Sequence, residues 1–94
     1  MYNPFSLENK VIIVTGASSG IGAQCAIDCS KMGARVVLVA RNEERLKQIL
    51  EQCEEPSRHI ILSLDLSSSE GLKEAIKDVV SKVGKINGVV NCAG

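Results

Sequence analysis

The stretch from Val11 to Gly22 constrains the fold of this chain more than any other. Four consecutive aliphatic residues, Val11–Val14, have the length and β-branching of a strand that is buried on both faces. Glycines follow at positions 16, 20 and 22, and a helical pattern begins at Gly20. Because a helix N-terminus offers unpaired N–H groups and a partial positive charge, this strand, glycine turn and helix predict a phosphate site.

Each glycine of the turn has its own steric reason. A side chain at Gly16 would block the tight turn, one at Gly20 would block the phosphate, and one at Gly22 would push the helix off the strand. The spacing G-x-x-x-G-x-G differs from the standard dinucleotide fingerprint and from the P-loop, which needs Lys and Ser or Thr where Ile21-Gly22 stands. Ser18 and Ser19 add hydrogen-bond donors, and together these features favour a nucleotide phosphate over a plain loop.

Strand-length apolar runs alternate with helical patterns along the whole chain. This alternation predicts right-handed β–α–β crossovers and an α/β fold, a doubly wound parallel sheet of Rossmann type with strand order 3-2-1-4, about half of a complete sheet. The expected strands are Val11–Val14, Arg35–Ala40, His59–Leu64 and Ile86–Asn91. The expected helices run from Gly20 to Met32, from Asn42 as N-cap to the run Glu54–Ser57, and from the capping box Ser67-x-x-Glu70 to Gly84.

Apolar stripes predict which face of each later helix is buried. The stripe of the second expected helix is Leu46, Ile49, Leu50 and Cys53, and that of the third is Leu72, Ile76, Val79, Val80 and Val83. Phe5 and Leu7 are expected to pack against the first strand, and His59, the single histidine, is interpreted as structural or solvent-exposed.

Two motifs carry a resemblance to a known family. The run Thr15-Gly16-Ala17-Ser18-Ser19-Gly20-Ile21-Gly22 resembles the cofactor motif of the classical short-chain dehydrogenase/reductase family, and Asn91-Cys92-Ala93-Gly94 resembles its second motif, Asn-Asn-Ala-Gly. The separation of the motifs is usual for the family, and the resemblance covers essentially the whole chain. It implies that residues 1–94 are the N-terminal half of a single Rossmann-type dinucleotide-binding domain. The expected cofactor-binding residues are Gly16, Ser18, Ser19, Gly20, Ile21, Gly22, Arg41, Asp65, Leu66, Asn91, Ala93 and Gly94.

The end of the second strand bears on cofactor choice. An NAD-binding protein carries Asp or Glu about 20 residues beyond the glycine turn, where it holds the ribose hydroxyls. Here Ala40 and Arg41 occupy that place, and a guanidinium can bind a 2′-phosphate bidentately. The sequence therefore favours NADP(H) over NAD(H), although Arg41 is also compatible with a solvated residue before a helix cap. Related NADP enzymes often carry Lys or Arg where Ser19 stands, so the preference is expected to be weaker here.

The remaining cofactor contacts follow from the resemblance alone. It implies that the Asp65 carboxylate accepts from the adenine amino group and that the Leu66 N–H reaches the ring. Without the resemblance, Asp65 is equally compatible with a cap or turn residue. It also implies that Asn91 lines the ribose and ties neighbouring strands together, with the Ala93-Gly94 backbone close to the same ribose. Cys92 replaces the second Asn of the motif and, with no base beside it, is not expected to be a catalytic thiol.

The family's catalytic residues are not found in these residues. The resemblance implies a Ser and then Tyr-x-x-x-Lys, in which the lysine lowers the tyrosine pKa so that the phenol exchanges a proton with the substrate oxygen while hydride moves. The single tyrosine here is Tyr2, in the entry segment. We therefore expect no catalytic residue in this chain, which on its own is expected to be an inactive fragment of an NADP-dependent carbonyl reductase or alcohol dehydrogenase.

Two other functions compete with an oxidoreductase. One is a non-catalytic dinucleotide-binding or sensor module on the same half-fold. The other is a Rossmann-like methyltransferase, which is disfavoured because the Ser18-Ser19 turn and Arg41 suit phosphates that S-adenosylmethionine lacks. A Tyr-x-x-x-Lys in the continuation of the reading frame would decide between an enzyme and a sensor.

Composition and charge limit the partners. The formal net charge is +0 and no basic stripe is present, so no nucleic acid is expected. Apolar runs are far shorter than the ~20 residues that span a bilayer. With no signal-peptide pattern at the N-terminus, a cytoplasmic protein is expected.

Cys25 and Cys29 are spaced as two helix-borne metal ligands but lack further ligands nearby, so small buried side chains are favoured and no metal is expected. The expected partners are a small carbonyl or alcohol substrate, 3-oxoacyl groups on a carrier included, and further copies in a homo-oligomer.

Overall fold

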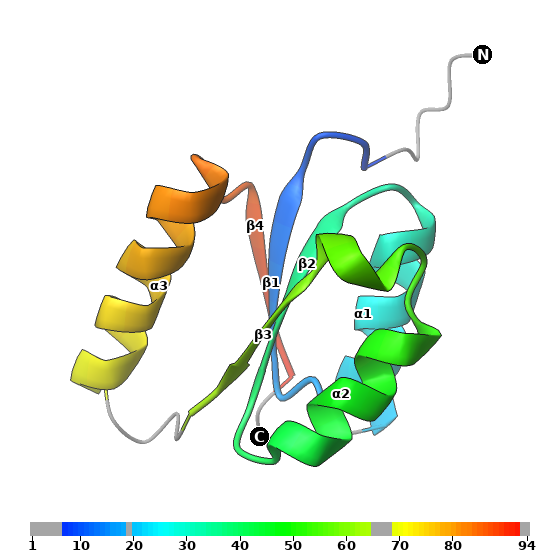
Figure 1. The fold of residues 1–94 in the computed structure, drawn as a ribbon, viewed down its shortest axis with the longest axis horizontal. Coiled ribbons are helices and arrows are strands. Elements are labelled where there is room, and N and C mark those ends of the chain that lie inside the picture. The colour runs from blue at the N-terminus through cyan, green and yellow to red at the C-terminus, as the bar shows by residue number, and fades with distance from the viewer. Residues whose placement is uncertain (1–6, 19, 65–68, 93–94) are drawn as a thin grey trace.

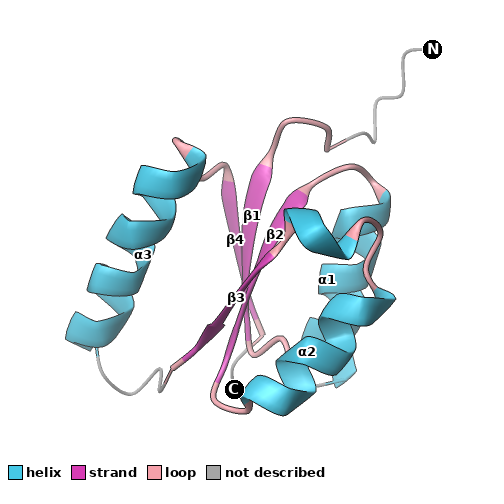
Figure 2. Ribbon diagram, viewed as in Figure 1, coloured by secondary structure: helices cyan, strands magenta, loops and turns pink. Residues whose placement is uncertain are grey.

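The computed structural model describes residues 7–18, 20–64 and 69–92, and it is an α/β structure with one parallel sheet (Figure 2). Its elements, in chain order, are β1 (Val11–Thr15), α1 (Gly20–Lys31), β2 (Arg35–Ala40), α2 (Glu43–Gln52), the short 3₁₀ helix η1 (Pro56–Arg58), β3 (Ile60–Ser63), α3 (Ser69–Val83) and β4 (Gly88–Asn91).

The four strands lie in the order β3-β2-β1-β4 and all pairs are parallel, which confirms the predicted order. In the register of the sheet, Val14 pairs with Leu38 on one side and with Val90 on the other. Figure 1 shows the sheet nearly edge-on, with α1 and α2 against one face and α3 on the opposite face. This is the arrangement that right-handed crossovers on either side of β1 produce.

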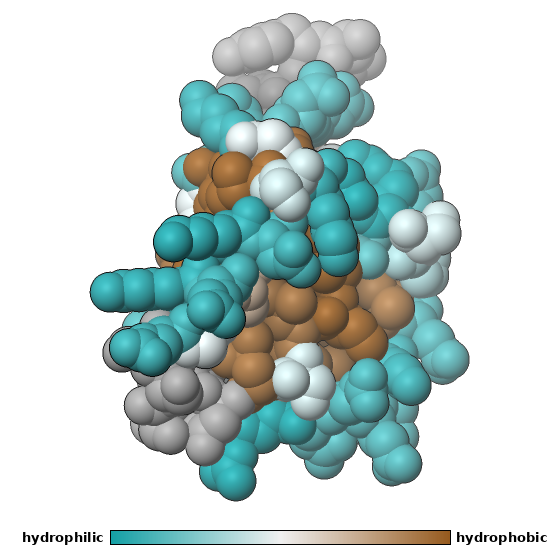
Figure 3. Space-filling view, turned by 60° about the vertical axis from the view of Figure 1, so that its left-hand side comes forward, coloured by the Kyte–Doolittle hydropathy of each residue, from teal (hydrophilic) through white to brown (hydrophobic). Residues whose placement is uncertain are grey.

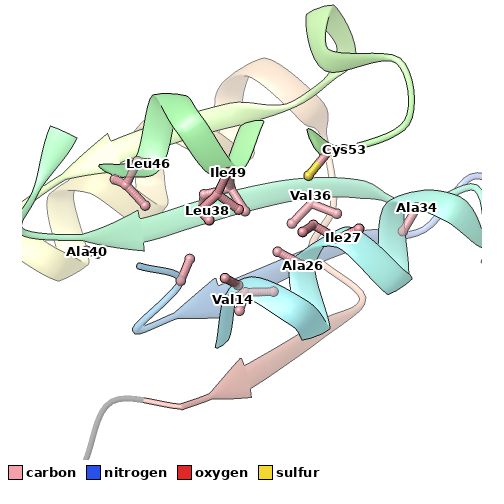
Figure 4. Close-up of a cluster of buried hydrophobic side chains, with 12 residues drawn as sticks. Val14, Ala26, Ile27, Ala34, Val36, Leu38, Ala40, Leu46, Ile49 and Cys53 are labelled. Carbon is pink, nitrogen blue, oxygen red and sulfur yellow. The ribbon is translucent and has the colours of Figure 1, made fainter. Parts of the chain in front are cut away.

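The face beneath α1 and α2 holds the larger core. Alternate residues of β2 point to this face because side chains of a strand alternate between its two sides. Val36 and Leu38 are fully buried, and they pack with Val14 and with Leu46 and Ile49 of α2 (Figure 4). The predicted stripe of the second helix is confirmed at these positions, and Cys53 closes the same cluster.

The opposite face is covered less completely. Val37 and Val39 of β2 pack with Val11, Ile13 and Val79. The predicted stripe of α3 is wrong at one position, since Val80 is exposed. A neighbour in sequence is turned by ~100° around a helix, so Val79 faces the sheet and Val80 does not. Leu72, Ile76 and Val83 are half-buried, and Figure 3 shows a broad apolar surface beside α3.

The element boundaries follow local backbone chemistry. Gly33 and Gly84 have φ of +100° and +88°, so both end their helices in the left-handed conformation that glycine favours. Asn42 caps α2 through its side-chain oxygen, which accepts from Arg45 N at 3.0 Å. The expected cap Ser67 lies outside the described residues.

The start of β4 and the segment before β1 can both be compared with the expectations from the sequence. β4 begins two residues later than expected, because Asn87 turns its side chain back to the start of β1. The Asn87 Oδ1 atom accepts from Val11 N at 2.9 Å, and Asn87 N donates to Val11 O at 2.8 Å. Leu7 packs against the larger core, to which the first strand contributes Val14, whereas Phe5 lies outside the described residues.

His59 is a structural residue, and it is buried rather than exposed. Its Nδ1 atom accepts from Val36 N at 3.0 Å, and Nε2 lies 2.7 Å from the carbonyl oxygen of Glu54. An acceptor role at Nδ1 places the proton on Nε2, so this ring is in one neutral tautomer. His59 therefore joins β2 to the segment that follows α2.

His59→Ala is expected to lower the free energy of unfolding of the complete gene product that contains residues 1–94 by about 1–3 kcal/mol, because Val36 N–H would be left buried without its acceptor. Arg58→Ala, at the neighbouring exposed position, is the matched control and is expected to cost less than ~0.5 kcal/mol. Urea unfolding measures both. Equal losses in the two variants would show that the His59 ring does not hold this junction.

Candidate functional site

The carboxyl ends of the four parallel strands form one edge of the sheet, at which α1 and α2 begin. Backbone hydrogen bonds join the segments that leave this edge. Ala17 N donates to Val39 O at 3.2 Å, Leu64 N to Ala40 O at 3.0 Å, and Cys92 N to Thr15 O at 3.1 Å. In open α/β sheets this edge is where ligands bind, at the point where the strand order reverses. Here that point lies between β1 and β4.

The glycine turn leads from β1 into α1 at this edge. Gly16 has a φ of +68°, in the left-handed region, so glycine is needed for the tight turn. Gly22 is buried, Ser18 is half-buried and Ile21 is 76% exposed. A Cβ built on Gly20 would meet no heavy atom within 4 Å, so open space stands at the N-terminus of α1. These features fit a diphosphate held by backbone N–H groups.

Two arginines flank the turn. Arg41 follows β2 directly and is exposed, and its carbonyl oxygen accepts from Ser63 Oγ at 2.8 Å. Arg45 lies in the first turn of α2, where its Nε atom donates to the carbonyl oxygen of Ser18 at 3.4 Å. The sequence reasoning missed Arg45. No spacing in the sequence indicates this bond, because Arg45 and Ser18 are 27 residues apart and meet only in the folded chain.

Asn91 ends β4 beside the glycine turn. Its side-chain oxygen accepts from Thr15 Oγ1 at 2.9 Å, and the same hydroxyl lies 3.4 Å from Val90 O. A side-chain bond between neighbouring strands is the tie that the resemblance implied for Asn91. Thr15, the donor, belongs to the first motif but was given no role from the sequence.

Five of the expected site residues lie outside the described residues: Ser19, Asp65, Leu66, Ala93 and Gly94. The described members are brought to the carboxyl edge from three elements: the turn into α1, the end of β2 and the end of β4. The structure thus assembles Gly16, Ser18, Gly20, Ile21, Gly22, Arg41 and Asn91 along one edge.

The cysteines do not form a metal cluster in the part of the chain that is described, where no group of three or more His, Cys, Asp or Glu side chains is placed to hold an ion. Cys29 is half-buried and packs against the larger core, where burial raises the pKa of its thiol. Burial also raises the pKa of the Cys53 thiol, which a hydrogen bond from Ser30 partly offsets.

A hollow of about 360 Å³ lies at the opposite, amino edge of the sheet. Glu8, Ser30, Glu54 and Arg58 are among the residues that line it, and it includes none of the expected site residues. Within the described ranges, no helix has the length and apolar character that crossing a membrane requires.

Comparison with known proteins places the site in a family. The family model for short chain dehydrogenases matches residues 10–94. An uncharacterized oxidoreductase of Staphylococcus epidermidis is 42% identical over 88 residues, which are 94% of this chain and 37% of that protein. The 3-ketodihydrosphingosine reductase of Bos taurus is 38% identical over 97 residues, 97% of this chain and 29% of that protein. The chain therefore spans 37% of the length of the first relative and 29% of the length of the second.

Solved structures agree with the sequence matches. The apo-form of glucose dehydrogenase of Caenorhabditis elegans superposes with a TM-score of 0.86 at 30% identity, over 98% of this chain and 40% of that one. A short chain dehydrogenase from Bacillus anthracis gives a TM-score of 0.87 at 32% identity, over 95% of this chain and 36% of that one. With a glycine turn, a parallel sheet and a family model that all agree, this chain belongs to the short-chain dehydrogenase family.

Proposed function

We propose that residues 1–94 form the cofactor-binding part of an NADP(H)-dependent oxidoreductase that transfers hydride between nicotinamide and a carbonyl or alcohol substrate. The family implies a nicotinamide dinucleotide, which supplies the hydride chemistry when it is bound. The observation that carries the NADP(H) assignment is the end of β2, where buried Ala40 is followed by exposed Arg41.

The residues at this edge have complementary tasks. Backbone N–H groups at the N-terminus of α1 would hold the diphosphate, and the open space at Gly20 would let it approach. Arg41 would form charge-assisted hydrogen bonds to a 2′-phosphate. Arg45 supports this assignment, because its guanidinium lies against the glycine turn and adds positive charge where the turn itself has serines. Asn91, held by Thr15, would line the ribose side.

Substrate recognition and proton transfer are proposed to lie outside these residues. The relatives include a 3-ketodihydrosphingosine reductase and an 11-beta-hydroxysteroid dehydrogenase, so hydrophobic ketones and alcohols are the first substrates to test. The competing function is a dinucleotide sensor without turnover. Incubation of the complete gene product with NADPH and a panel of ketones separates the two, because a sensor would bind NADPH and leave it unoxidised.

Arg41→Ala in the complete gene product is expected to weaken NADPH binding by ~1.5–3 kcal/mol, the usual contribution of a hydrogen bond to a charged group, and to leave NADH binding nearly unchanged. Fluorescence titration of the reduced cofactors measures both affinities. Lys47→Ala, which removes another exposed cation from the same segment, is the matched control and should change neither. Equal losses for NADPH and NADH in Arg41→Ala would show that Arg41 does not recognise the 2′-phosphate.

A further inference from the structure

Arg45 of α2 contacts the glycine turn, 27 residues earlier in the chain. Its Nε atom donates to the carbonyl oxygen of Ser18 at 3.4 Å, and its Nη1 atom donates to Gln48 Oε1 at 3.3 Å. The side chain is otherwise exposed to solvent. These bonds place a cation of the second helix beside the turn that leads into the first.

The backbone around Arg45 brings three segments to one corner of the sheet edge. Ala17 N donates to Val39 O at 3.2 Å, so the glycine turn lies beside the end of β2. Arg41 follows β2, and the next residue, Asn42, caps α2 by accepting from Arg45 N at 3.0 Å. Figure 1 shows α1 and α2 on the same face of the sheet, with both helices beginning at this edge. The glycine turn, the end of β2 and the first turn of α2 therefore border the same corner.

The positive charge at this corner is not neutralised by the described residues. No carboxylate among them forms an ion pair with Arg41 or Arg45. A guanidinium has five N–H donors, and Arg45 uses two of them in its bonds to Ser18 and Gln48. Its other donors bond to no described residue, so they are available to an anion. Because like charges repel, an anion bound at this corner would also offset the repulsion between the two arginines.

The geometry of a bound dinucleotide indicates which anion reaches this corner. In Rossmann-type sheets the diphosphate lies at the N-terminus of the first helix, and the 2′ position of the adenosine ribose lies by the end of the second strand. The 2′ substituent therefore lies near Arg41 and the start of α2. In NADP(H) this substituent is a phosphate, whose oxygens match the planar fork of a guanidinium.

We propose that Arg45 is a specificity-determining residue that binds the 2′-phosphate of NADP(H) together with Arg41. The inference rests on the proposed function, in which this edge of the sheet binds a nicotinamide dinucleotide. Arg45 provides from α2 the positive charge that a turn with Ser18 and Ser19 lacks. The preference for NADP(H) is then strong, in contrast to the weaker preference that Ser19 alone predicts.

The bond to Ser18 also allows a purely structural role, in which Arg45 only holds the glycine turn in shape. That role needs a hydrogen-bond donor but no charge, and its loss affects both dinucleotides equally because both bind the turn through the diphosphate. Binding of the 2′-phosphate needs the charge, and its loss affects NADP(H) alone. Arg45→Gln keeps a donor without the charge, whereas Arg45→Lys keeps the charge without the fork, so the two variants separate the roles.

The test is isothermal titration of NADPH, NADH and adenosine 2′,5′-bisphosphate into the complete gene product that contains residues 1–94. Arg45→Ala is expected to raise the dissociation constants of NADPH and the bisphosphate at least ~10-fold, as loss of a hydrogen bond to a charged group does, and to leave that of NADH unchanged. Arg45→Gln should match Arg45→Ala, and Arg45→Lys should recover part of the affinity. Lys47→Ala, which removes an exposed cation from the same helix, is the matched control and should change none of the three.

Three results would overturn the inference. Equal losses for NADPH and NADH in Arg45→Ala, with recovery in Arg45→Gln, would show that Arg45 only shapes the turn. Unchanged affinities in Arg45→Ala, beside a selective loss of NADPH in Arg41→Ala, would show that Arg41 binds the 2′-phosphate alone, and the proposed function would stand. Binding of neither dinucleotide by the unsubstituted protein would contradict the proposed function and this inference together.

Discussion

Gly20→Val in the complete gene product should abolish binding of NADPH and NADH alike while leaving the secondary structure intact. Gly20 is the first residue of α1, and a Cβ there would meet no heavy atom within 4 Å, so the folded chain accepts a side chain at this position. The isopropyl group would instead occupy the space through which a diphosphate must approach the N–H groups of the helix. The loss therefore comes from steric exclusion of the ligand and not from unfolding.

We expect the dissociation constants of both cofactors to rise at least ~100-fold, which corresponds to ~2.7 kcal/mol. Isothermal titration measures the constants, and far-ultraviolet circular dichroism checks the fold. Lys31→Val is the matched control, because it adds the same side chain at an exposed position at the far end of α1. An unchanged dissociation constant in a correctly folded Gly20→Val protein would show that the diphosphate does not bind at this turn.

Much of the fold was predictable because it depends on patterns along the chain. The run Arg35–Ala40 was expected as a strand, and its bounds are confirmed. Its alternate residues fill two different cores, Val36 and Leu38 on one face and Val37 and Val39 on the other. Only a central strand of a sheet covered on both faces needs an unbroken apolar run, so this pattern also predicted helices on both faces. The strand order was expected from the alternation of strands and helices.

The parts that could not be predicted are bonds between a side chain and a distant backbone group. The His59 ring accepts from Val36 N, 23 residues earlier, and Asn87 Oδ1 accepts from Val11 N, 76 residues earlier. No spacing rule connects such positions, because the contact exists only after the strands have paired. The bond from Arg45 to the glycine turn escaped prediction for the same reason.

The same distinction applies to the candidate site, where the topology predicts which residues meet but not the bonds between them. In a parallel sheet the carboxyl ends of β1, β2 and β4 meet at one edge. This topology was enough to predict that the glycine turn, Arg41 and Asn91 lie together. How the edge is held together does not follow from topology. The hydroxyl of Thr15 donates to the amide oxygen of Asn91, and Arg45 Nε donates to the carbonyl oxygen of Ser18. These contacts depend on the rotamers that packing selects.

Residues 1–94 expressed alone should show no dehydrogenase activity and should self-associate. Among the described residues β4 pairs on one side only, with β1, and presents its other edge. On the face that α3 covers incompletely, Val89 is 61% exposed and Val80 is 37% exposed. Figure 3 shows the apolar surface that results. An open strand edge beside a broad apolar patch is a template for association, and a chain of this size has little core with which to offset it.

Light scattering after size exclusion, urea unfolding and ketone-dependent NADPH oxidation test this expectation. Val89→Lys provides the internal comparison, because a charge on an edge strand opposes pairing with another chain. It should shift the scattering towards a monomer, whereas Lys47→Ala, on the opposite face of the sheet, should not. A monodisperse monomer that unfolds cooperatively without any substitution would contradict the association. Turnover by the purified 94 residues would place the catalytic groups within them, against the proposal that Tyr-x-x-x-Lys chemistry lies elsewhere.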